Sequence, residues 1–511
     1  MSESRRQTYS GIGTMKLVVK DMDIATGDVP VIILNQKDAH EMDLHPMDRV
    51  MVSKNGRKTL AILDIAESKK AVPPGHIGFF EEVLAALKVK HGDIVRIGVA
   101  EKPESVTHIK EKLDGKHLTP SDIRIIVKDI VENKLTDVEL TSFVIASYTR
   151  GMNMKEVAAL TEAMAETGDT LRFNKYPVVD VHSIGGVPGN RTTMLIVPIL
   201  VAAGCIVPKT SSRAITSPAG TADTMEVLCP VSLPVSKLKK IIDDVGGFII
   251  WGGAVNLAPA DDRIIRVEHP LSIDAEGQML ASIMAKKASV GSTHLLMEIP
   301  IGPGTKVKSQ KHAKHLRRHF SELGHALKIK VKTIITDGSQ PIGRGIGPIL
   351  EARDVIWVLK CNECAPQDLV KKSLKMAGIL LEFTGKARAG QGYKLAHTLL
   401  TTGAAYGAMT RIVEAQGGTM PDPGKLKPAS KTYVYRAEKN GALSCIENTA
   451  ISKTARLAGA PVDPDAGIYL HKHCDERVRK GEPILTIYSR SAHKLSNAIR
   501  ALRKLKGVVV E

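Results

Sequence analysis

Aromatic side chains are scarce in this sequence: Phe, Tyr and Trp together make up 4% of its 511 residues. A core must therefore rest on aliphatic residues, and the 43% hydrophobic content is ordinary for a globular chain. The scarcity also affects how the formal net charge of +17 is interpreted. Taken alone, that charge favours a nucleic-acid partner. Because bases stack on aromatic rings, and because Lys and Arg are spread along the chain, we expect no nucleic-acid partner and favour an enzyme that binds phosphorylated small molecules.

Cysteine is rare as well, with six residues in the chain. That number excludes the disulfide framework of small secreted domains. Cys361 and Cys364 form a lone C-x2-C pair. Two ordinary thiols are favoured there, with a redox pair or a disulfide left open. No run of about 18 apolar residues occurs, and residues 1–14 lack the apolar core of a signal peptide, so we expect a cytoplasmic protein without a membrane partner.

The length allows three or four domains, and the residue patterns predict a multidomain α/β protein. Two segments, 44–52 and 89–97, resemble each other in a strand-rich region, as in a small β-barrel built from two similar halves. Helical spacing follows Pro120-Ser-Asp and recurs over 137–148 and 154–165. The predicted order is a disordered tail (1–14), a β-rich N-terminal domain (15–100), a helical domain (101–175, completed by 259–289), an α/β phosphate-binding domain (176–258 and 290–423) and an α+β C-terminal domain (424–511).

Two turns between residues 178 and 226 carry the main functional signal. The first follows a predicted strand at 178–181, contains Gly185, Gly186 and Gly189, and precedes an apolar helix at about 191–203. A helix N-terminus offers unpaired N–H groups and partial positive charge, and glycine lets the backbone approach a ligand closely, so this turn suits an anion. The second turn, 210–221, is rich in hydroxyls and contains Arg213, which can bind a phosphate through two hydrogen bonds.

Neither turn matches GxxxxGK[ST] or a clean GxGxxG, which disfavours a P-loop or a dinucleotide-binding site. Each turn alone is as compatible with a tight strand-to-helix connection as with an anion site. The two in succession favour a site that handles phosphate.

The residues of these turns resemble those of a known family. Asp180-Val-His-Ser-Ile-Gly-Gly186 is similar to the DKHSTGG motif of thymidine phosphorylases and related pyrimidine nucleoside phosphorylases. SIGGVPGN, KTSSRAITS and AGTAD are similar to the AMP phosphorylase branch, and the resemblance covers nearly the whole chain after about Met15. Further matching segments, in chain order, are Val207-Pro-Lys-Thr-Ser-Ser-Arg, Leu257-Ala-Pro-Ala-Asp-Asp, Leu280-Ala-Ser-Ile-Met-Ala-Lys-Lys287 and Gln340-Pro-Ile-Gly-Arg-Gly-Ile-Gly-Pro.

The resemblance implies phosphorolysis of a nucleoside 5′-monophosphate (AMP, with CMP and UMP open) by inorganic phosphate, in a cleft between a helical and an α/β domain. It implies Asp274 as the acid that protonates the leaving base. The residues that it assigns to AMP are Gly186, Ser212, Arg213, Ala214, Ile215, Thr216, Ser217, Thr221, Ser282 and Lys306. Further candidates are Ser183 and Thr192 for inorganic phosphate, His182 for the sugar or base, and Lys286 for the base. The resemblance implies no metal or organic cofactor, since phosphate is the nucleophile, and a homodimer or larger homo-oligomer.

Simpler interpretations stand beside these roles. Asp274 also suits the N-cap of a helix at 275–287, Lys286 a solvated helix face, and His182 the end of a core strand. Val181 replaces the phosphate-binding lysine of thymidine phosphorylases, and residues 215–221 replace their GHTGGT segment, which fits a substrate that brings its own 5′-phosphate. A thymidine or other pyrimidine nucleoside phosphorylase is the first alternative. A basic nucleic-acid-binding protein on an inactive phosphorylase fold is the second.

Overall fold

The structure is a computed structural model that describes residues 14–511 except 28, 175, 215, 216, 272 and 274. The described residues form two compact units. One contains the chain up to Arg150 together with Arg266–Ile273, and the other contains the rest. The predicted fold class is confirmed, because a β-rich domain is followed by helices, an α/β region and an α+β C-terminal region.

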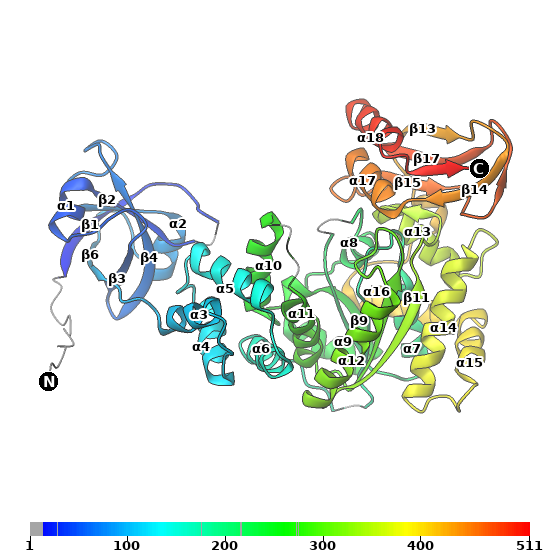
Figure 1. Ribbon diagram of the computed structural model, residues 1–511, viewed down its shortest axis with the longest axis horizontal. Coiled ribbons are helices and arrows are strands. Elements are labelled where there is room, and N and C mark those ends of the chain that lie inside the picture. Colours follow the sequence, from blue (N-terminus) through cyan, green and yellow to red (C-terminus); the bar gives the residue numbers. More distant parts are fainter. Residues whose placement is uncertain (1–13, 28, 175, 215–216, 272, 274) are drawn as a thin grey trace. The chain divides into compact units, whose positions relative to one another are not determined.

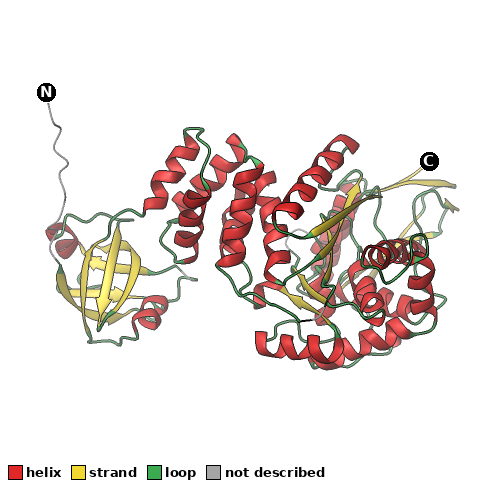
Figure 2. Cartoon of the chain, turned by 90° about the horizontal axis from the view of Figure 1, so that it is seen from below, coloured by secondary structure: helices red, strands yellow, loops and turns green. Residues whose placement is uncertain are grey.

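The first unit begins with a β-rich domain. Its elements are β1 (Met15–Asp21), β2 (Val31–Asn35), α1 (Gln36–Glu41), β3 (Arg49–Lys54), β4 (Arg57–Ala66), β5 (His76–Phe79), α2 (Glu81–Leu87) and β6 (Ile94–Val99). The strands close into a barrel in the order β1-β5-β2-β4-β3-β6 (Figure 2). Alternate side chains of these strands point inward and form an aliphatic core with a single aromatic ring, that of Phe79. The barrel therefore agrees with the low aromatic content of the sequence.

The barrel strands pair with approximate twofold symmetry. β1 runs parallel to β5 as β4 does to β2, while β2 with β5 and β3 with β6 pair antiparallel. The two similar sequence segments occupy equivalent places, since each leads into β3 or β6 and includes the first four residues of that strand. In each, an aspartate accepts a backbone hydrogen bond from the residue three positions earlier, Asp48 from His45 at 2.7 Å and Asp93 from Lys90 at 2.8 Å. The prediction of a small barrel built from two similar halves is confirmed.

Helices follow the barrel. They are α3 (Glu104–Leu113), α4 (Pro120–Val131) and α5 (Asp137–Arg150) in the first unit, α6 (Met154–Glu166) and α11 (Glu276–Ser289) in the second, and α10 (Pro259–Leu271), within which the division falls. Thr119 and Asn153 begin α4 and α6 with capping boxes, so these helices start where their first orphan N–H groups find side-chain acceptors. Within the second unit α11 packs along α6.

The α/β region fills the centre of the second unit. Its strands are β7 (Val179–Ser183), β8 (Val207–Ser211), β9 (Gly247–Trp251), β10 (His294–Ile301) and β11 (Lys330–Asp337). Its helices are α7 (Thr192–Ala202), α8 (Thr221–Glu226), α9 (Val235–Val245), η1 (Gly252–Ala254), α12 (Gln310–Ala326), α13 (Pro348–Leu359), α14 (Gln367–Phe383), α15 (Gly392–Thr401) and α16 (Ala404–Gln416). The predicted apolar helix is α7. All its residues from Thr192 to Val201 are buried, against α14 and α16 among others, as expected for a helix that is apolar on every side (Figure 1).

The C-terminal region is α+β, as predicted. Its elements are η2 (Pro423–Lys425), β13 (Lys431–Arg436), β14 (Gly441–Ile446), α17 (Asn448–Ala458), β15 (Gly467–Leu470), β16 (Arg477–Val478), β17 (Pro483–Ser489), α18 (Ala492–Lys504) and β18 (Val508–Val510). Figure 1 shows α17 and α18 beside β13, β15 and β17. One strand of this sheet comes from much earlier in the chain, since β12 (Gly345–Ile346) pairs antiparallel with β15.

Candidate active site

The parallel strands of the α/β region bring the two predicted turns to one edge of the sheet. β11, β10 and β7 pair in that order, β8 pairs with β9, and a parallel bridge between Val178 and Ile206 joins the two sets. From β7 the chain therefore proceeds to β8 and β9 on one side, and then to β10 and β11 on the other. In open parallel sheets a ligand binds beyond the carboxyl ends of the strands where the order reverses, which here is between β7 and β10.

The first glycine turn follows β7 and touches the turn after β10. Gly186 has φ +95°, and a Cβ built on it would lie 2.6 Å from Thr305 Cα and 3.0 Å from the backbone nitrogen of Lys306. Only glycine fits there without moving the neighbouring backbone. Two residues that the resemblance assigns to AMP, Gly186 and Lys306, thus lie side by side.

Asn190 connects the two hydroxyls that we expect to bind inorganic phosphate. Its amide nitrogen lies 3.4 Å from Ser183 Oγ, and its amide oxygen accepts a hydrogen bond from Thr192 Oγ1 at 3.1 Å. The same amide nitrogen donates to the buried carboxylate of Glu298 at 3.1 Å. Ser183 and Thr192 are therefore neighbours held at the N-terminus of α7. Sequence reasoning did not single out Asn190.

The second turn follows β8, and one carboxylate accepts hydrogen bonds from two parts of its backbone. Asp223, in the first turn of α8, accepts hydrogen bonds from the backbone nitrogens of Ala214 at 2.7 Å and Gly220 at 2.8 Å. Gly220 also packs directly on the backbone of Ser212. Ser217 lies in the same turn and donates to the carbonyl of Ala219 at 3.0 Å. Ile215 and Thr216, also predicted to bind AMP, lie outside the described residues.

Arg213 is bound by protein carboxylates. Its guanidinium donates to both oxygens of Glu226, at 2.5 and 2.7 Å, and to Asp223 at 3.3 Å. It also lies over the ring of Trp251, with 4.9 Å to the ring centroid. These carboxylates raise the pKa of Arg213. They also accept hydrogen bonds from the guanidinium N–H groups that we expected to bind a phosphate. In this arrangement its guanidinium fixes the turn instead of facing a substrate anion.

Arg191 joins the two turns, and sequence reasoning missed it. It stands at the N-cap of α7 and donates to the carbonyl of Ala219 at 2.7 Å and to Thr221 Oγ1 at 3.2 Å. Its third partner is the buried carboxylate of Glu351, which Thr224 also contacts. Burial raises the pKa of Glu351, while the Arg191 charge opposes that rise. A hydrogen bond from Arg191, at the end of the first turn, thus helps to fix Thr221 of the second turn.

Lysines surround the end of β7. The buried Asp180 carboxylate lies 3.2 Å from Lys209 Nζ and 2.8 Å from Lys287 Nζ, so two ammonium groups share one anion. Although burial acts in the opposite direction, these ammonium groups lower the pKa of Asp180. Burial, together with the charges of four lysines, Lys287, Lys209, Lys286 and Lys306, holds the pKa of His182 well below its usual value. His182 is therefore a neutral imidazole in a positive environment, which attracts anions.

Helix α11 carries the residues predicted for the base. Ser282 is half-buried on this helix, one turn before Lys286. Lys286 is not a freely solvated lysine, because its ammonium lies 2.7 Å from the buried carboxylate of Asp261. Asp261 stands in the first turn of α10. Asp274, the predicted acid, lies outside the described residues, and the N-cap residue of α11 is Ala275.

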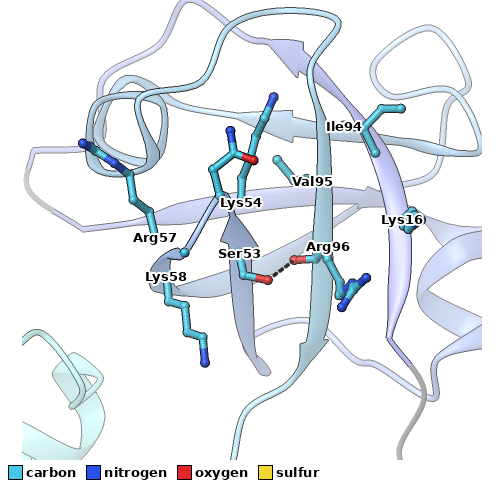
Figure 3. Close-up of a pocket in the computed structure, with 10 residues that line it drawn as sticks. Lys16, Ser53, Lys54, Arg57, Lys58, Ile94, Val95 and Arg96 are labelled. Carbon is cyan, nitrogen blue, oxygen red and sulfur yellow. Dashed lines mark hydrogen bonds between the residues drawn. The ribbon is translucent and has the colours of Figure 1, made fainter.

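Other features lie apart from this constellation. A shallow basic pocket on the barrel is lined by Lys16, Lys54, Arg57, Lys58 and Arg96 among others (Figure 3). Lys54 there is paired with Asp93 at 2.7 Å. Cys361 and Cys364 are free and exposed, which agrees with ordinary thiols. Among the helices that the structure describes, none combines the length and the apolar character that a membrane span requires.

Three sequence families match successive parts of the chain. They are the glycosyl transferase family helical bundle domain over residues 106–168, the glycosyl transferase family a/b domain over 175–291, and the pyrimidine nucleoside phosphorylase C-terminal domain over 442–507. AMP phosphorylase from Methanococcus maripaludis is 44% identical over 97% of both chains, and AMP phosphorylase from Pyrococcus furiosus is 45% identical over 97% of this chain and 98% of its own.

A solved structure agrees on the fold. Anthranilate phosphoribosyltransferase from Thermus thermophilus superposes with a TM-score of 0.53 at 20% identity, covering 60% of this chain and 98% of its own. At that identity the likeness concerns the fold alone.

Proposed function

The chain belongs to the AMP phosphorylase family, and from that premise we propose how its residues catalyse the phosphorolysis of AMP. An oxygen of inorganic phosphate forms a bond to C1′ of the nucleotide while the C1′–N bond to the base breaks. The electron pair of that bond goes to the base nitrogen, and an acid supplies a proton to the base. The products are the free base and ribose 1,5-bisphosphate, so the enzyme is a pentosyltransferase.

Each of the two turns binds one of the two phosphate groups. The second turn, with Ser212, Ser217 and Thr221, binds the 5′-phosphate, with the neighbouring backbone from Ala214 to Thr216 in the same segment. Ser183 and Thr192 bind inorganic phosphate at the start of α7, where N–H groups and the helix dipole favour an anion. Holding both anions in fixed relation contributes several kcal/mol through orientation. Arg213 contributes through the shape of the second turn, since its guanidinium is already paired.

The excess positive charge at β7 replaces the lysine that thymidine phosphorylases have where this chain has Val181. Two buried lysines share the single carboxylate of Asp180, three residues before Ser183 on β7, so positive charge exceeds negative charge there when both lysines are protonated. In a site of low dielectric such a charge acts over several ångströms. It lowers the cost of bringing two phosphate groups together.

The remaining roles concern the base. Asp274 protonates the leaving base, a contribution of about two to four orders of magnitude for a positioned acid. Ser282 hydrogen-bonds the base, with Lys286 one helical turn further on the same side of α11. Lys306, beside Gly186, binds the nucleotide, and the neutral His182 contacts the sugar or base. CMP and UMP are further candidate substrates.

The same proposal covers the cofactors, the partners and the location of the enzyme. Inorganic phosphate is the nucleophile, so the reaction needs no metal or organic cofactor. The partners are AMP, phosphate and further copies of this chain, as a homodimer or larger homo-oligomer in the cytoplasm, with no nucleic acid and no membrane.

One observation carries this assignment: the reversal of strand order between β7 and β10, where the Gly186 turn and the Lys306 turn touch. The test measures phosphate-dependent release of base from AMP, adenosine and thymidine. Turnover of AMP alone, abolished in Asp274→Asn while AMP still binds, supports the proposal. Equal turnover of thymidine contradicts the role of the second turn. Retention of RNA without any turnover contradicts the proposal as a whole and favours the binding-protein alternative.

A further inference from the structure

Three histidines line one face of α12. His312, His315 and His319 stand at positions i, i+3 and i+7 of that helix, a spacing that places their side chains in a row. All three direct a ring nitrogen at the same carboxylate, that of Glu276 in the first turn of α11. Within the described residues this is a group of imidazoles and carboxylate from two different helices, separate from the phosphate turns.

The distances leave room for a shared cation. Glu276 Oε1 lies 2.9 Å from His315 Nε2 and 3.3 Å from His319 Nδ1, and Glu276 Oε2 lies 3.3 Å from His312 Nε2. The ligand atoms of Glu276, His315 and His319 all lie within 4.8 Å of one another. In a tetrahedral zinc site each ligand atom lies about 2.0–2.2 Å from the metal, so small rotations of these side chains bring all of them within bonding distance.

The cluster is poorly explained as an ordinary hydrogen-bond network. His319 Nδ1 is buried and, in the described part of the chain, accepts and donates no hydrogen bond, although it faces Glu276 at close range. His312 and His315 are each 42% exposed at the side chain, so a cation has access from solvent.

We propose that Glu276, His315 and His319, with His312 as the fourth ligand, form a binding site for a divalent transition-metal ion, Zn²⁺ in the first instance. Three imidazoles and one carboxylate are the donor set that zinc accepts in tetrahedral geometry. The bound ion links α12 to the first turn of α11, the helix that carries Ser282 and Lys286. The site is therefore a metal clamp on that helix and takes no part in the chemistry of phosphorolysis.

The test measures Zn²⁺ binding to the full-length, metal-stripped protein by isothermal titration calorimetry in phosphate-free buffer. Cys361→Ser and Cys364→Ser are both introduced into every protein compared, because that exposed pair is the main competing zinc ligand. We expect one Zn²⁺ per chain, with at least 10-fold weaker binding in His315→Gln and in Glu276→Gln. His325→Gln is the matched control, since His325 is exposed on the same helix outside the cluster, and we expect no change there.

A second measurement uses Co²⁺ as the probe. Tetrahedral Co²⁺ absorbs strongly in the visible range, and ligation by nitrogen and oxygen alone lacks thiolate charge-transfer bands. We expect such a spectrum in the cysteine-free background and its loss in His319→Gln, with unchanged far-ultraviolet circular dichroism to establish that the variant is folded. Zinc binding that persists unchanged in the His315→Gln and Glu276→Gln variants, or an octahedral cobalt spectrum unaffected by them, overturns the proposal.

Discussion

Arg191 donates a hydrogen bond to Thr221 Oγ1 at 3.2 Å, across a separation of 30 residues in the chain. The same guanidinium holds the carbonyl of Ala219 and the buried carboxylate of Glu351. The first turn and the second turn are therefore one structural unit. One side chain thus contacts both of the turns to which we assign the two phosphates.

Replacing Arg191 separates its structural role from its positioning role. Arg191→Met leaves Glu351 buried without its partner, so we expect a loss of about 3–5 kcal/mol in the free energy of unfolding. We also expect at least a 10-fold rise in KM for AMP, because Thr221 is released. The measurements are denaturant unfolding and steady-state kinetics.

The double variant Arg191→Met with Glu351→Gln is the control for this prediction. It removes the unpaired buried charge and recovers much of the stability. The raised KM should remain, since Thr221 still lacks its donor. Recovery of KM together with stability would show that Arg191 acts on the site only through folding.

The contact between Gly186 and the Lys306 turn gives a second prediction. Gly186→Ala places a methyl group 2.6 Å from Thr305 Cα, which pushes the two turns apart. Gly185→Ala is a matched control, because Gly185 has φ +98° against +95° for Gly186, yet a Cβ there meets nothing within 4 Å. Both variants carry left-handed strain of about 1–2 kcal/mol, and Gly186→Ala should lose further stability through its contact with the backbone of Thr305.

Kinetics distinguish the two glycine variants. We expect KM for AMP to rise at least 10-fold in Gly186→Ala and less than 3-fold in Gly185→Ala. Equal effects on KM would mean that backbone strain, and not the contact with the Lys306 turn, determines nucleotide binding.

Local patterns predicted much of this fold. The helices were predicted from apolar spacing, the barrel from the similarity of 44–52 to 89–97, and the positions of the two turns from glycine and hydroxyl content. The helix and turn signals succeed because each arises from residues within one turn of each other, and the barrel signal succeeds because its two halves have similar local patterns. For the same reason the N-terminus of α7 was placed to within one residue.

Long-range pairings were not predictable in this way. Arg191 follows a glycine turn and its partner Glu351 stands 160 residues later, so nothing local marks the pair. Arg213 was assigned to a phosphate because only its neighbours in the turn were considered, while Glu226 lies on the next helix. The histidine spacing on α12 is visible in the sequence, but the carboxylate that completes the cluster comes from α11. Which side chains converge depends on packing that one segment does not encode.

The lysines on Asp180 give a prediction that depends on pH. Burial lowers the pKa of Lys287 to about 7, so its ammonium loses its charge as pH rises through that value. If this charge assists phosphate binding, Lys287→Met should raise KM for inorganic phosphate about 3–10-fold at pH 6 and much less at pH 8. Comparing the two proteins at each pH cancels the titration of phosphate itself.

An exposed lysine at the amino edge of the sheet, away from the turns at the carboxyl edge, is the control for this effect. Lys330 is exposed at the start of β11, at the amino edge, so Lys330→Met should leave KM for phosphate unchanged. An equal effect of both substitutions would point to overall charge instead of a local potential. An effect of Lys287→Met that does not diminish at pH 8 would contradict the assigned titration.

Asp354 supplies the last prediction, which concerns stability. This buried carboxylate on α13 accepts hydrogen bonds from the backbone nitrogens of Arg344 and Gly345, both at 2.7 Å, and its Oδ1 has no hydrogen-bond partner among the described residues. Burial raises the pKa of Asp354 from 3.8 to about 7, since those hydrogen bonds offset only part of the desolvation. Between about pH 4 and pH 7 the folded protein therefore keeps a proton that the unfolded chain has released. Stability from this group falls as pH rises through that window, by up to about 4 kcal/mol, and stays constant above it.

Asp354→Asn tests this sign directly. Asparagine still accepts from the two backbone nitrogens but does not titrate, so the variant should gain stability relative to the parent as pH rises from 5 to 8. The measurement is the urea midpoint of both proteins at several pH values, where the difference between them cancels the other titrating groups. Because only the unfolded state releases this proton below pH 7, the gain must level off above that pH. A constant difference between the two midpoints across the range would mean that Asp354 is already ionised in the folded protein at pH 5, and that the two backbone donors outweigh its burial.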